Sequence, residues 1–400
     1  MLNCFFKCLL LCVYCFSLSV PNPNGLEKIY KISDAKNTEI IAIYPEYQDS
    51  EKYGERPNSL DDKNLLTLNS TFNWESHDSY GIKSLKDLYV AKVNGAYISP
   101  KHLGTIFTNN QQFLFDIMVS PGYPMFWPVD SSVTNYGVQR YKKIATVQGP
   151  TLFYHWVIDR LPSVFLLRDL LLKDPEMKLI INDYKGGVAS YVHAYLDLLG
   201  IPASQIIVGH NRAVYYADEV YFATPFLMEP IPKNLLVALK NELIRNALTR
   251  AQKRYNDNLI VIIQRREADR RFSNIDQLSQ VLRNKFPSNK YELVVFDDNM
   301  PLCEQINIFN NAKLVISPMA SGLTNIIYTK PDTTIVEIHQ TLPYLVDAAG
   351  LNKYGAEWCW WLSSAVGAKY WVIPTAYKLS DLHISAPIDA IEKILQTIVL

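Results

Sequence analysis

The sequence predicts an α/β protein of two doubly wound domains in tandem, with a ligand site in the cleft between them. A length of 400 residues is long for one hydrophobic core and fits two such domains. Short apolar runs alternate with helical patterns from about residue 144 onward, which is typical of parallel sheets. The stretch Lys313–Ile338 contains one complete unit, a strand, a tight turn of small residues, a short helix and a second strand.

The composition and net charge of the chain indicate which binding partners are expected. About half of the residues are hydrophobic (48%), 20% are charged and the formal net charge is zero, which is an ordinary globular profile. Binding to nucleic acid needs a basic excess or a basic stripe, so we expect no nucleic-acid partner.

Residues 1–20 differ from the rest of the chain. Lys7 precedes an apolar run, Cys8–Val20, in which Ser17-Leu18-Ser19 resembles a small-x-small cleavage site, and this pattern predicts a cleaved secretory signal peptide. A short signal anchor and a segment without a targeting role are the alternatives, because the run is shorter than the roughly 20 residues of a spanning helix. Only Cys303 and Cys359 lie outside this segment, so no disulfide framework or cysteine metal site is expected.

The first predicted domain covers residues 86–232, after a polar, loosely structured lead-in at 21–85. Asn94-Gly95 lies between two strand-like runs in 89–99 and predicts a hairpin turn. The other expected elements are strands at 113–118, 144–147, 178–181, 206–208 and 220–223, and helices at 162–172 and 188–199.

The second predicted domain covers residues 233–400. Thr224–Pro232 carries three prolines and predicts the domain boundary. The expected helices are 234–255, 274–285, 302–311, 323–328, 357–366 and 388–400, and the expected strands are 259–263, 293–296, 314–316, 335–338 and 370–373.

His155 and Asp159 form the first candidate constellation. In a helix they lie one turn apart on the same face. The carboxylate can then hold one imidazole tautomer, or either group can accept a proton from a sugar hydroxyl. The alternative is a pair that only fastens the end of a helix.

An arginine-rich segment, Gln264–Arg271, follows a buried strand directly. Arginines such as Arg265 and Arg271 at the carboxyl edge of a sheet can grip phosphate in bidentate fashion. A solvated charged loop is the alternative. Asn274, just beyond, fits a ligand contact or a helix cap.

The turn inside Lys313–Ile338 is the third candidate. Ser321 and Thr324 offer hydroxyls, Gly322 permits close approach of the backbone and Asn325 offers an amide. Backbone N–H groups at such a turn bind anions. A plain strand-to-helix turn, with Asn325 satisfying local backbone, is the alternative.

Glu337 ends the strand that follows this turn, where its carboxylate can accept a hydrogen bond from a ribose hydroxyl. The alternative is a surface carboxylate.

Several motifs are absent from the sequence. No Asp-x-Asp triplet occurs, so the usual carboxylate site for a metal–diphosphate complex is missing and no metal ligands are expected. No GxSxG, HExxH or Walker sequence occurs, which disfavours hydrolases, zinc proteases and P-loop enzymes.

Taken in order, these segments resemble glycosyltransferase family 61, over about residues 136–372. The family's HWxxDxLP motif is matched by His155, Trp156, Asp159, Leu161 and Pro162. The further matches are Gln264-Arg265, Arg271, Asn274, Glu304-Gln305, Ala320–Asn325, Glu337 and a closing segment from Cys359 to Val372.

The resemblance implies a GT-B fold of two Rossmann-like domains, with the donor in the second domain and the acceptor facing the first. It implies an inverting, metal-independent transfer from a nucleotide sugar, expected to be a UDP-sugar, to a glycan or protein hydroxyl. No cofactor is implied, because the nucleotide sugar is a co-substrate.

Roles for the matched residues follow from the resemblance together with the chemistry above. Asp159 or His155 is the base for the acceptor hydroxyl, and Arg265 and Arg271 neutralise diphosphate. Asn274, Ser321, Gly322, Thr324 and Asn325 complete the donor site, with Glu337 at the ribose.

The sequence departs from the family pattern at the turn. Met319 stands where many members have a histidine, Gln264 replaces a serine and Ala320-Ser321 replaces Gly-Ala. A methionine cannot supply the hydrogen bond of an imidazole. The alternatives are therefore a GT-B protein that has lost catalysis and binds glycan or nucleotide, and a sugar-nucleotide epimerase.

The resemblance also bears on localisation. Nucleotide sugars occur in cytoplasm and in the lumen of the endoplasmic reticulum and Golgi, so a eukaryotic protein is expected in the secretory pathway. A bacterial one is expected at the cytoplasmic face, with membrane contact only through the N-terminal segment.

Overall fold

The computed structural model describes most of the chain as two compact units. Unit 1 takes the described residues of 1–46 and 86–229, and unit 2 takes those of 47–85 and 230–400. The described residues are 27–29, 37–45, 58–59, 88–113, 129–149, 151–182, 188–226, 231–265, 271–297, 299–341, 357–376 and 383–398. The expected signal peptide at 1–20 lies outside them. Among the described helices, none has the length and apolar character needed to cross a membrane.

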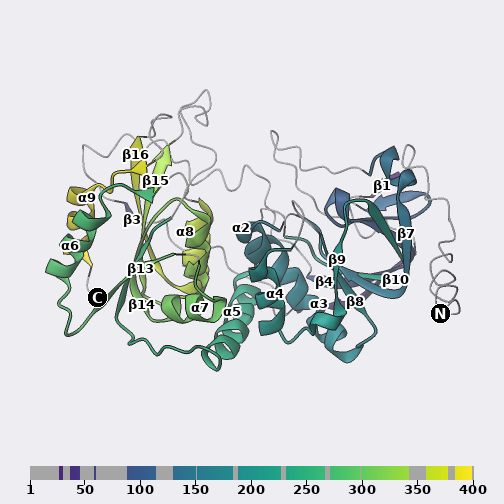
Figure 1. The fold of residues 1–400 in the computed structure, drawn as a ribbon, viewed down its shortest axis with the longest axis horizontal. Coiled ribbons are helices and arrows are strands. Elements are labelled where there is room, and N and C mark those ends of the chain that lie inside the picture. Colours follow the sequence, from purple (N-terminus) through teal and green to yellow (C-terminus); the bar gives the residue numbers. More distant parts are fainter. Residues whose placement is uncertain are drawn as a thin grey trace, which may run out of the picture. The chain divides into compact units, whose positions relative to one another are not determined.

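Unit 1 is built on a mixed nine-stranded sheet rather than a purely parallel one (Figure 1). The strands β10, β7, β8 and β9 are parallel neighbours, whereas β4 pairs antiparallel with β10, β5 and β2. The bounds are β1 (Glu27–Ile29), β2 (Thr38–Ile43), β4 (Tyr89–Ser99), β5 (Thr105–Phe107), β6 (Gln111–Phe113), β7 (Gly137–Thr146), β8 (Lys178–Asn182), β9 (Ile206–Gly209) and β10 (Ala213–Ala223).

The predicted hairpin at Asn94-Gly95 is wrong. The strand β4 continues through both residues and keeps one register with β10, with Asn94 opposite Glu219 and Ala96 opposite Ala217. Gly95 has φ +64, so its left-handed backbone makes a kink inside the strand instead of a turn. Pairing along β10 on both sides of the kink outweighs the local turn preference.

The lead-in also contributes to both sheets. Thr38–Ile43 pairs with β4 as β2, and Asn58–Ser59 pairs with β16 as the short strand β3. The predicted strand at 113–118 lies outside the described residues beyond Phe113.

Helices of unit 1 connect its parallel strands. The chain leaves β7 through α2 (Phe153–His155), the π-helical turn η6 (Trp156–Arg160) and α3 (Leu161–Lys173), and returns to β8. Helix α3 carries Pro162 in its first turn, where the missing N–H costs nothing, and packs its apolar side chains against β10 and β4. Helix α4 (Ser190–Leu198) ends before Gly200, whose φ of +77 closes the helix as expected.

Unit 2 is a parallel sheet with helices on both faces, as predicted (Figure 1). Helices α6 (Ile275–Lys285) and α9 (Ile388–Thr397) cover one face, and α5 (Lys233–Leu248), α7 (Leu302–Asn310) and α8 (Glu357–Val366) cover the other. The strand order is β13 (Glu292–Phe296), β11 (Leu259–Ile263), β14 (Ala312–Pro318), β15 (Thr334–Thr341), β16 (Lys369–Ala376) and β3.

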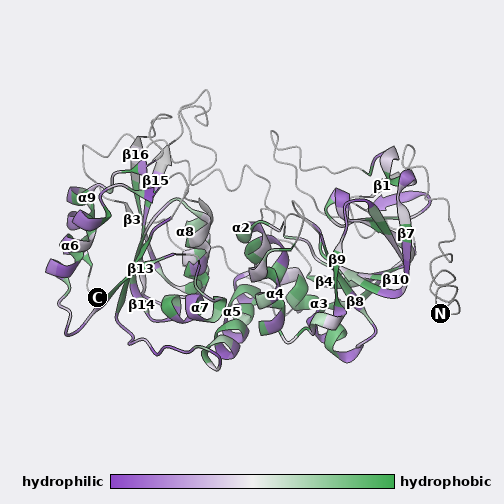
Figure 2. Cartoon of the chain, viewed as in Figure 1, coloured by the Kyte–Doolittle hydropathy of each residue, from purple (hydrophilic) through white to green (hydrophobic). Residues whose placement is uncertain are grey.

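The core of unit 2 explains this arrangement. Alternate residues of β11, β14 and β15, including Ile260, Ile316 and Val336, are buried in one cluster with residues of α6 and α9. Figure 2 shows hydrophobic residues along the central strands and hydrophilic residues on the outer side of α6. Strands that are buried on both faces read as continuous apolar runs, which is why the sequence pattern located them.

Helix α5 is shorter than expected, because it ends at Leu248 and not near Tyr255. The following segment is held by α7 instead. Glu304 accepts hydrogen bonds from the N–H groups of Gln252 and Lys253, and Asn307 donates to the Lys253 carbonyl. These contacts hold the segment after Leu248 in an irregular, non-helical path that local helix preference does not predict.

Candidate functional site

His155 and Asp159 are in direct contact at the start of the helix that follows β7. The Nδ1 atom of His155 lies 2.6 Å from Oδ2 of Asp159, so the predicted pairing one turn apart is confirmed. The turn between them is π-helical, since the N–H of Leu161 donates to the Trp156 carbonyl five residues earlier. Single π turns of this kind are frequent at functional sites.

This pair has an asymmetric environment. The Asp159 side chain is fully buried, whereas that of His155 is 20% exposed. With Nδ1–H donating to the carboxylate, Nε2 of His155 is left with its lone pair and can accept a proton. The Tyr154 ring stands edge-on to the imidazole at 5.4 Å between centroids and limits its movement. The arrangement is compatible with both readings of the pair, a general base and a contact that only stabilises the start of the helix.

In unit 2 the turn at Ser321-Gly322 lies against the carboxyl ends of two strands. A Cβ atom added to Gly322 would lie 3.4 Å from Ile263 at the end of β11 and 4.0 Å from Phe296 at the end of β13. The N–H of Gln264 donates to the Phe296 carbonyl at 2.9 Å, which joins the same two strand ends. The structure therefore brings the turn and the residues directly after β11 to one edge of the sheet.

Arg265 is the first arginine at this edge. Its Nη1 atom is buried and has no hydrogen-bond partner among the described residues. A buried guanidinium nitrogen without a partner is costly, so this atom is available to an anion. The predicted charged loop at 266–270 lies outside the described residues.

The turn continues into η8 (Ser321–Tyr328), a 3₁₀ helix in which Ser321 is exposed while Thr324 and Asn325 are buried. The Asn325 amide donates to the Gly322 carbonyl at 3.1 Å, the local role named as the alternative. Its Oδ1 atom and the Thr324 hydroxyl have no hydrogen-bond partner in the described part of the chain. Two polar groups in this turn thus remain available to a ligand or to water.

The far end of η8 is held by a lysine. Lys240 on α5 donates to the Thr329 carbonyl just past the last residue of the helix. Burial lowers the pKa of Lys240 to about 8. This contact fixes the orientation of η8 and hence of the turn at its other end.

Arg271 and Asn274 lie on a strip that Gln264 joins to the end of β11, because its side-chain amide donates to the Phe272 carbonyl at 3.0 Å and accepts from the Phe272 N–H at 2.9 Å. Arg271 is exposed in β12 (Arg271–Phe272), which pairs with β17 (His383–Ile384). The Asn274 amide donates to the Ala386 carbonyl at 3.0 Å and accepts from the Ala386 N–H at 2.7 Å. Asn274 makes no side-chain cap to α6, so its described contacts fasten the segment before α9.

Glu337 is a buried carboxylate, so the surface alternative is wrong. It is 1% exposed, and it accepts hydrogen bonds from His339 at 2.9 Å and from Tyr370 at 2.5 Å. Burial alone would raise the pKa of Glu337, but hydrogen bonds from His339, Tyr370 and Cys359 together hold it below its usual range. The carboxylate is therefore the centre of an internal network between β15, β16 and α8.

Met319 occupies the entrance to the turn. Its N–H donates to the Ile338 carbonyl at 3.1 Å, which extends the pairing of β14 with β15 by one step. The next residue of β15 is His339. Met319 offers no imidazole to the turn. The nearest position of the neighbouring strand does carry one, that of His339, but its side chain is fully buried against Glu337.

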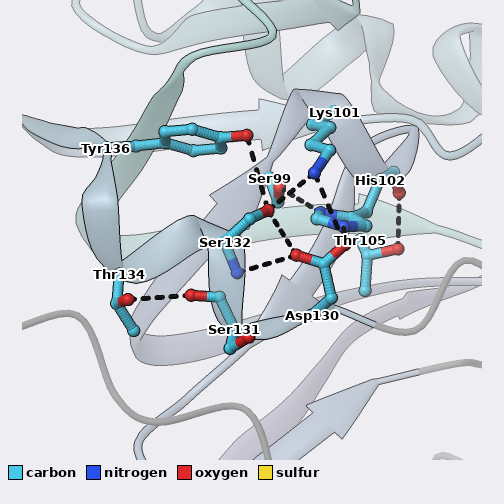
Figure 3. Close-up of polar contacts among 9 residues, drawn as sticks. All are labelled: Ser99, Lys101, His102, Thr105, Asp130, Ser131, Ser132, Thr134 and Tyr136. Atoms are coloured by element: carbon cyan, nitrogen blue, oxygen red, sulfur yellow. Dashed lines mark hydrogen bonds and ion pairs between the residues drawn. The ribbon is translucent and has the colours of Figure 1, made fainter.

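A serine–histidine–aspartate contact in unit 1 is structural (Figure 3). Ser99 lies 2.7 Å from Nδ1 of His102, and Nε2 of His102 lies 3.3 Å from Asp130. Ser99 has no exposed surface, so it cannot act as a nucleophile on an external substrate. Ser132 donates to Asp130 and, with the His102 contact, holds the pKa of that carboxyl below its usual range. The cluster joins η4 (Pro100–His102) to η5 (Ser131–Asn135).

Two further features of the described residues are the absence of a metal-ligand cluster and the burial of Arg160. No group of three or more His, Cys, Asp or Glu side chains among them is placed to hold a metal ion. Arg160, beside Asp159, is fully buried, a property that sequence reasoning did not find because an arginine before a helix normally reads as exposed.

Comparisons with known proteins add one match. Residues 153–336, slightly less than half of the chain, match the family model described as Glycosyltransferase 61. The matched segment begins at α2, immediately before His155, and ends inside β15, one residue before Glu337. A search of curated proteins found no match.

Proposed function

Because residues 153–336 form a glycosyltransferase family 61 domain, this chain is a glycosyltransferase, and we propose that it moves a sugar from a nucleotide sugar to a hydroxyl of a glycan or protein. The observation that carries the proposal is the extent of the match. One family segment includes both the His155–Asp159 pair and the turn at Ser321–Asn325, the candidate base and the candidate anion site. A UDP-sugar is the expected donor.

The proposed reaction is a single displacement with inversion. The acceptor O–H gives its proton to the His155–Asp159 pair while its oxygen forms a bond to the anomeric carbon. The bond from that carbon to the diphosphate oxygen breaks, and the nucleoside diphosphate leaves with the electron pair. The 2.6 Å contact to a buried carboxylate supports a pair that can hold the transferred proton.

The leaving diphosphate needs positive charge and N–H donors in a metal-independent reaction. We assign these to Arg265 and Arg271 and to the backbone at Ser321 and Gly322. The Nη1 atom of Arg265, which has no hydrogen-bond partner among the described residues, supports its role, and the position of Gly322 at the ends of β11 and β13 supports the role of the turn.

Thr324, Asn325 and Asn274 complete the proposed donor site. The free Thr324 hydroxyl and Asn325 Oδ1 support the first two. Asn274 would have to exchange a contact to Ala386, and Glu337 would have to release a donor before it could accept from ribose. Those two assignments remain predictions.

The finer architecture and the location of the protein are also proposals. The GT-B arrangement of the two units is proposed from the family match. A cleaved or uncleaved N-terminal signal would place a eukaryotic enzyme in the lumen of the secretory pathway, and a bacterial one at the cytoplasmic face of the membrane.

The proposal is tested by nucleoside diphosphate release from a panel of UDP- and GDP-sugars, with and without EDTA. Release with one donor class, unchanged by EDTA, and an inverted anomeric signal in the product by NMR are the expected results. Release that stops with EDTA would overturn metal independence. Full-length protein that releases nothing but still binds UDP by calorimetry would favour a binding protein over an enzyme.

A further inference from the structure

The side-chain amide of Gln264 joins two segments of unit 2 whose linked residues are eight positions apart in the chain. Gln264 is the first residue after β11. Its Nε2 donates to the Phe272 carbonyl at 3.0 Å, and its Oε1 accepts from the Phe272 N–H at 2.9 Å. Two residues of neighbouring antiparallel strands exchange the same pair of bonds. A side chain thus makes the sheet-like connection between the end of β11 and β12.

This contact lies directly between the two candidate diphosphate arginines. Arg265 follows Gln264 in the chain, and Arg271 precedes Phe272. Consecutive Cα atoms are about 3.8 Å apart, so each arginine starts one residue away from one end of the contact. The amide of Gln264 therefore sets where the backbone of Arg271 lies relative to that of Arg265.

The strand β12 has further contacts that do not involve Gln264. The Phe272 side chain is 1% exposed and belongs to the hydrophobic core of unit 2. The Ser273 N–H donates to the Ile384 carbonyl at 2.8 Å, next to the pairing of β12 with β17. The segment thus has a fixed backbone on which Arg271 is exposed.

We propose that Gln264 is a positioning residue that holds Arg271 beside Arg265, so that two guanidinium groups bind one diphosphate. The inference rests on the proposed function, because it takes the diphosphate of the donor as the ligand of both arginines. Arg265 contributes a buried Nη1 atom that has no hydrogen-bond partner among the described residues. A diphosphate spreads its negative charge over two phosphates, and two arginines can neutralise both.

Pre-organisation explains why a residue that does not touch the donor affects its binding. Ordering an arginine side chain on binding costs free energy. When the backbone of Arg271 is fixed beforehand, only its side chain has to be ordered. Without the Gln264 contact, the backbone of β12 has to be ordered as well. The loss of Gln264 therefore weakens binding although no ligand contact is removed.

The decisive variant is Gln264→Met, which keeps the length of the side chain and removes both hydrogen bonds. Gln280→Met is the matched control, because the Gln280 amide donates to Asn284 on the exposed side of α6 and does not contact β12. Calorimetry with UDP should give a Kd about tenfold higher for Gln264→Met than for wild type. The control should bind UDP as wild type does. Uridine, which has no phosphate, should bind Gln264→Met and wild type equally.

A double-mutant cycle with Arg271→Ala tests whether Gln264 acts through that arginine. Arg271→Ala should raise the Kd for UDP by about 10- to 100-fold. The double variant should bind UDP no more weakly than Arg271→Ala alone, because the arginine that Gln264 holds is already absent.

Amide hydrogen exchange at Phe272, followed by NMR, measures the contact without a ligand. This N–H donates to the Gln264 side chain, so loss of the acceptor in Gln264→Met should speed its exchange. Gln280→Met should leave that exchange rate unchanged. Gln264→Asn, whose amide is too short to keep both bonds, should match Gln264→Met in exchange and in UDP affinity, and it replaces that variant if methionine prevents folding.

The outcomes separate the inference from the proposed function. Wild-type UDP affinity in Gln264→Met, or effects of Gln264→Met and Arg271→Ala that add in the double variant, would overturn the inference and leave the donor site in place. Weaker binding of uridine by Gln264→Met would make the effect a general disturbance of the site and would also overturn it. Failure of wild type itself to bind UDP would overturn the proposed donor site and the inference together.

Discussion

The carboxylate of Asp159 accepts from the imidazole of His155 at 2.6 Å, across one π-helical turn that leaves the carboxylate fully buried. This contact unites two groups that the sequence places four residues apart. It makes the pair, and not either residue alone, the unit that takes up a proton.

Replacing the members of this pair should reduce turnover without loss of donor binding. Asp159→Asn and His155→Gln each remove proton acceptance, and we expect kcat to fall by about 10²–10⁴-fold. Donor binding by calorimetry should stay within about twofold. Asp169→Asn and His193→Gln, at exposed positions on α3 and α4, are the controls. Normal turnover in both pair variants would place the base elsewhere.

Removal of Arg265 should weaken the binding of the donor more than it slows the reaction of the acceptor. The Nη1 atom of this residue is buried without a described partner, so a diphosphate would gain a charge-assisted hydrogen bond there. Loss of such a bond costs about 1.5–3 kcal/mol, which corresponds to about 10- to 100-fold in Kd. Isothermal calorimetry with UDP compares Arg265→Ala with Arg283→Ala, an exposed arginine on α6. Equal affinities in the two variants would remove Arg265 from the donor site.

Thr324 in η8 and Thr329, just past the end of that helix, separate a ligand contact from a structural one. The Thr329 hydroxyl donates to the Ile326 carbonyl at 2.7 Å, whereas the Thr324 hydroxyl has no partner among the described residues. Thr329→Val should lower the free energy of unfolding by about 1 kcal/mol and leave donor KM unchanged. Thr324→Val should leave stability equal or higher and raise donor KM. Urea unfolding and donor kinetics of the two variants test this, and a stability loss in Thr324→Val with normal KM would contradict it.

Unit 2 was predictable from sequence because its central strands β11, β14 and β15 are buried on both faces. Runs such as Leu259–Ile263 and Leu314–Ile316 carry no polar residue, and the helix predicted after each of them begins within two residues of its expected start. Unit 1 was less predictable because Asn94-Gly95 is a strong local turn signal inside a long strand. Only the pairing with β10, more than a hundred residues later in the chain, decides between kink and hairpin.

The candidate site was predictable in its residue types but not in its burial. Periodicity placed His155 and Asp159 together, yet it carried no signal that Arg160 is buried beside them. Glu337 shows the same limit, because a carboxylate after an apolar run reads as exposed. Of its three donors, Tyr370 comes from the next strand and Cys359 from a helix, so only tertiary packing shows that Glu337 is internal.

Glu337→Gln should make the free energy of unfolding less dependent on pH on the acid side. The same variant tests whether Glu337 contacts the donor. The folded state holds the pKa of Glu337 below its unfolded value through bonds from His339 and Tyr370. Such a group stabilises the fold above the unfolded pKa, and that contribution is lost as the pH falls through the folded pKa. Wild type should therefore lose stability on acidification from pH 7 more steeply than the variant.

At pH 7 the variant should be less stable by about 1–3 kcal/mol, because an amide cannot accept from every donor of this network. Urea unfolding at pH 7 and pH 4 measures both effects, with Glu392→Gln, exposed on α9, as the control. Unchanged UDP affinity in a destabilised Glu337→Gln protein would make the residue structural and remove it from the donor site. A loss of affinity with stability retained would instead place its carboxylate at the ribose.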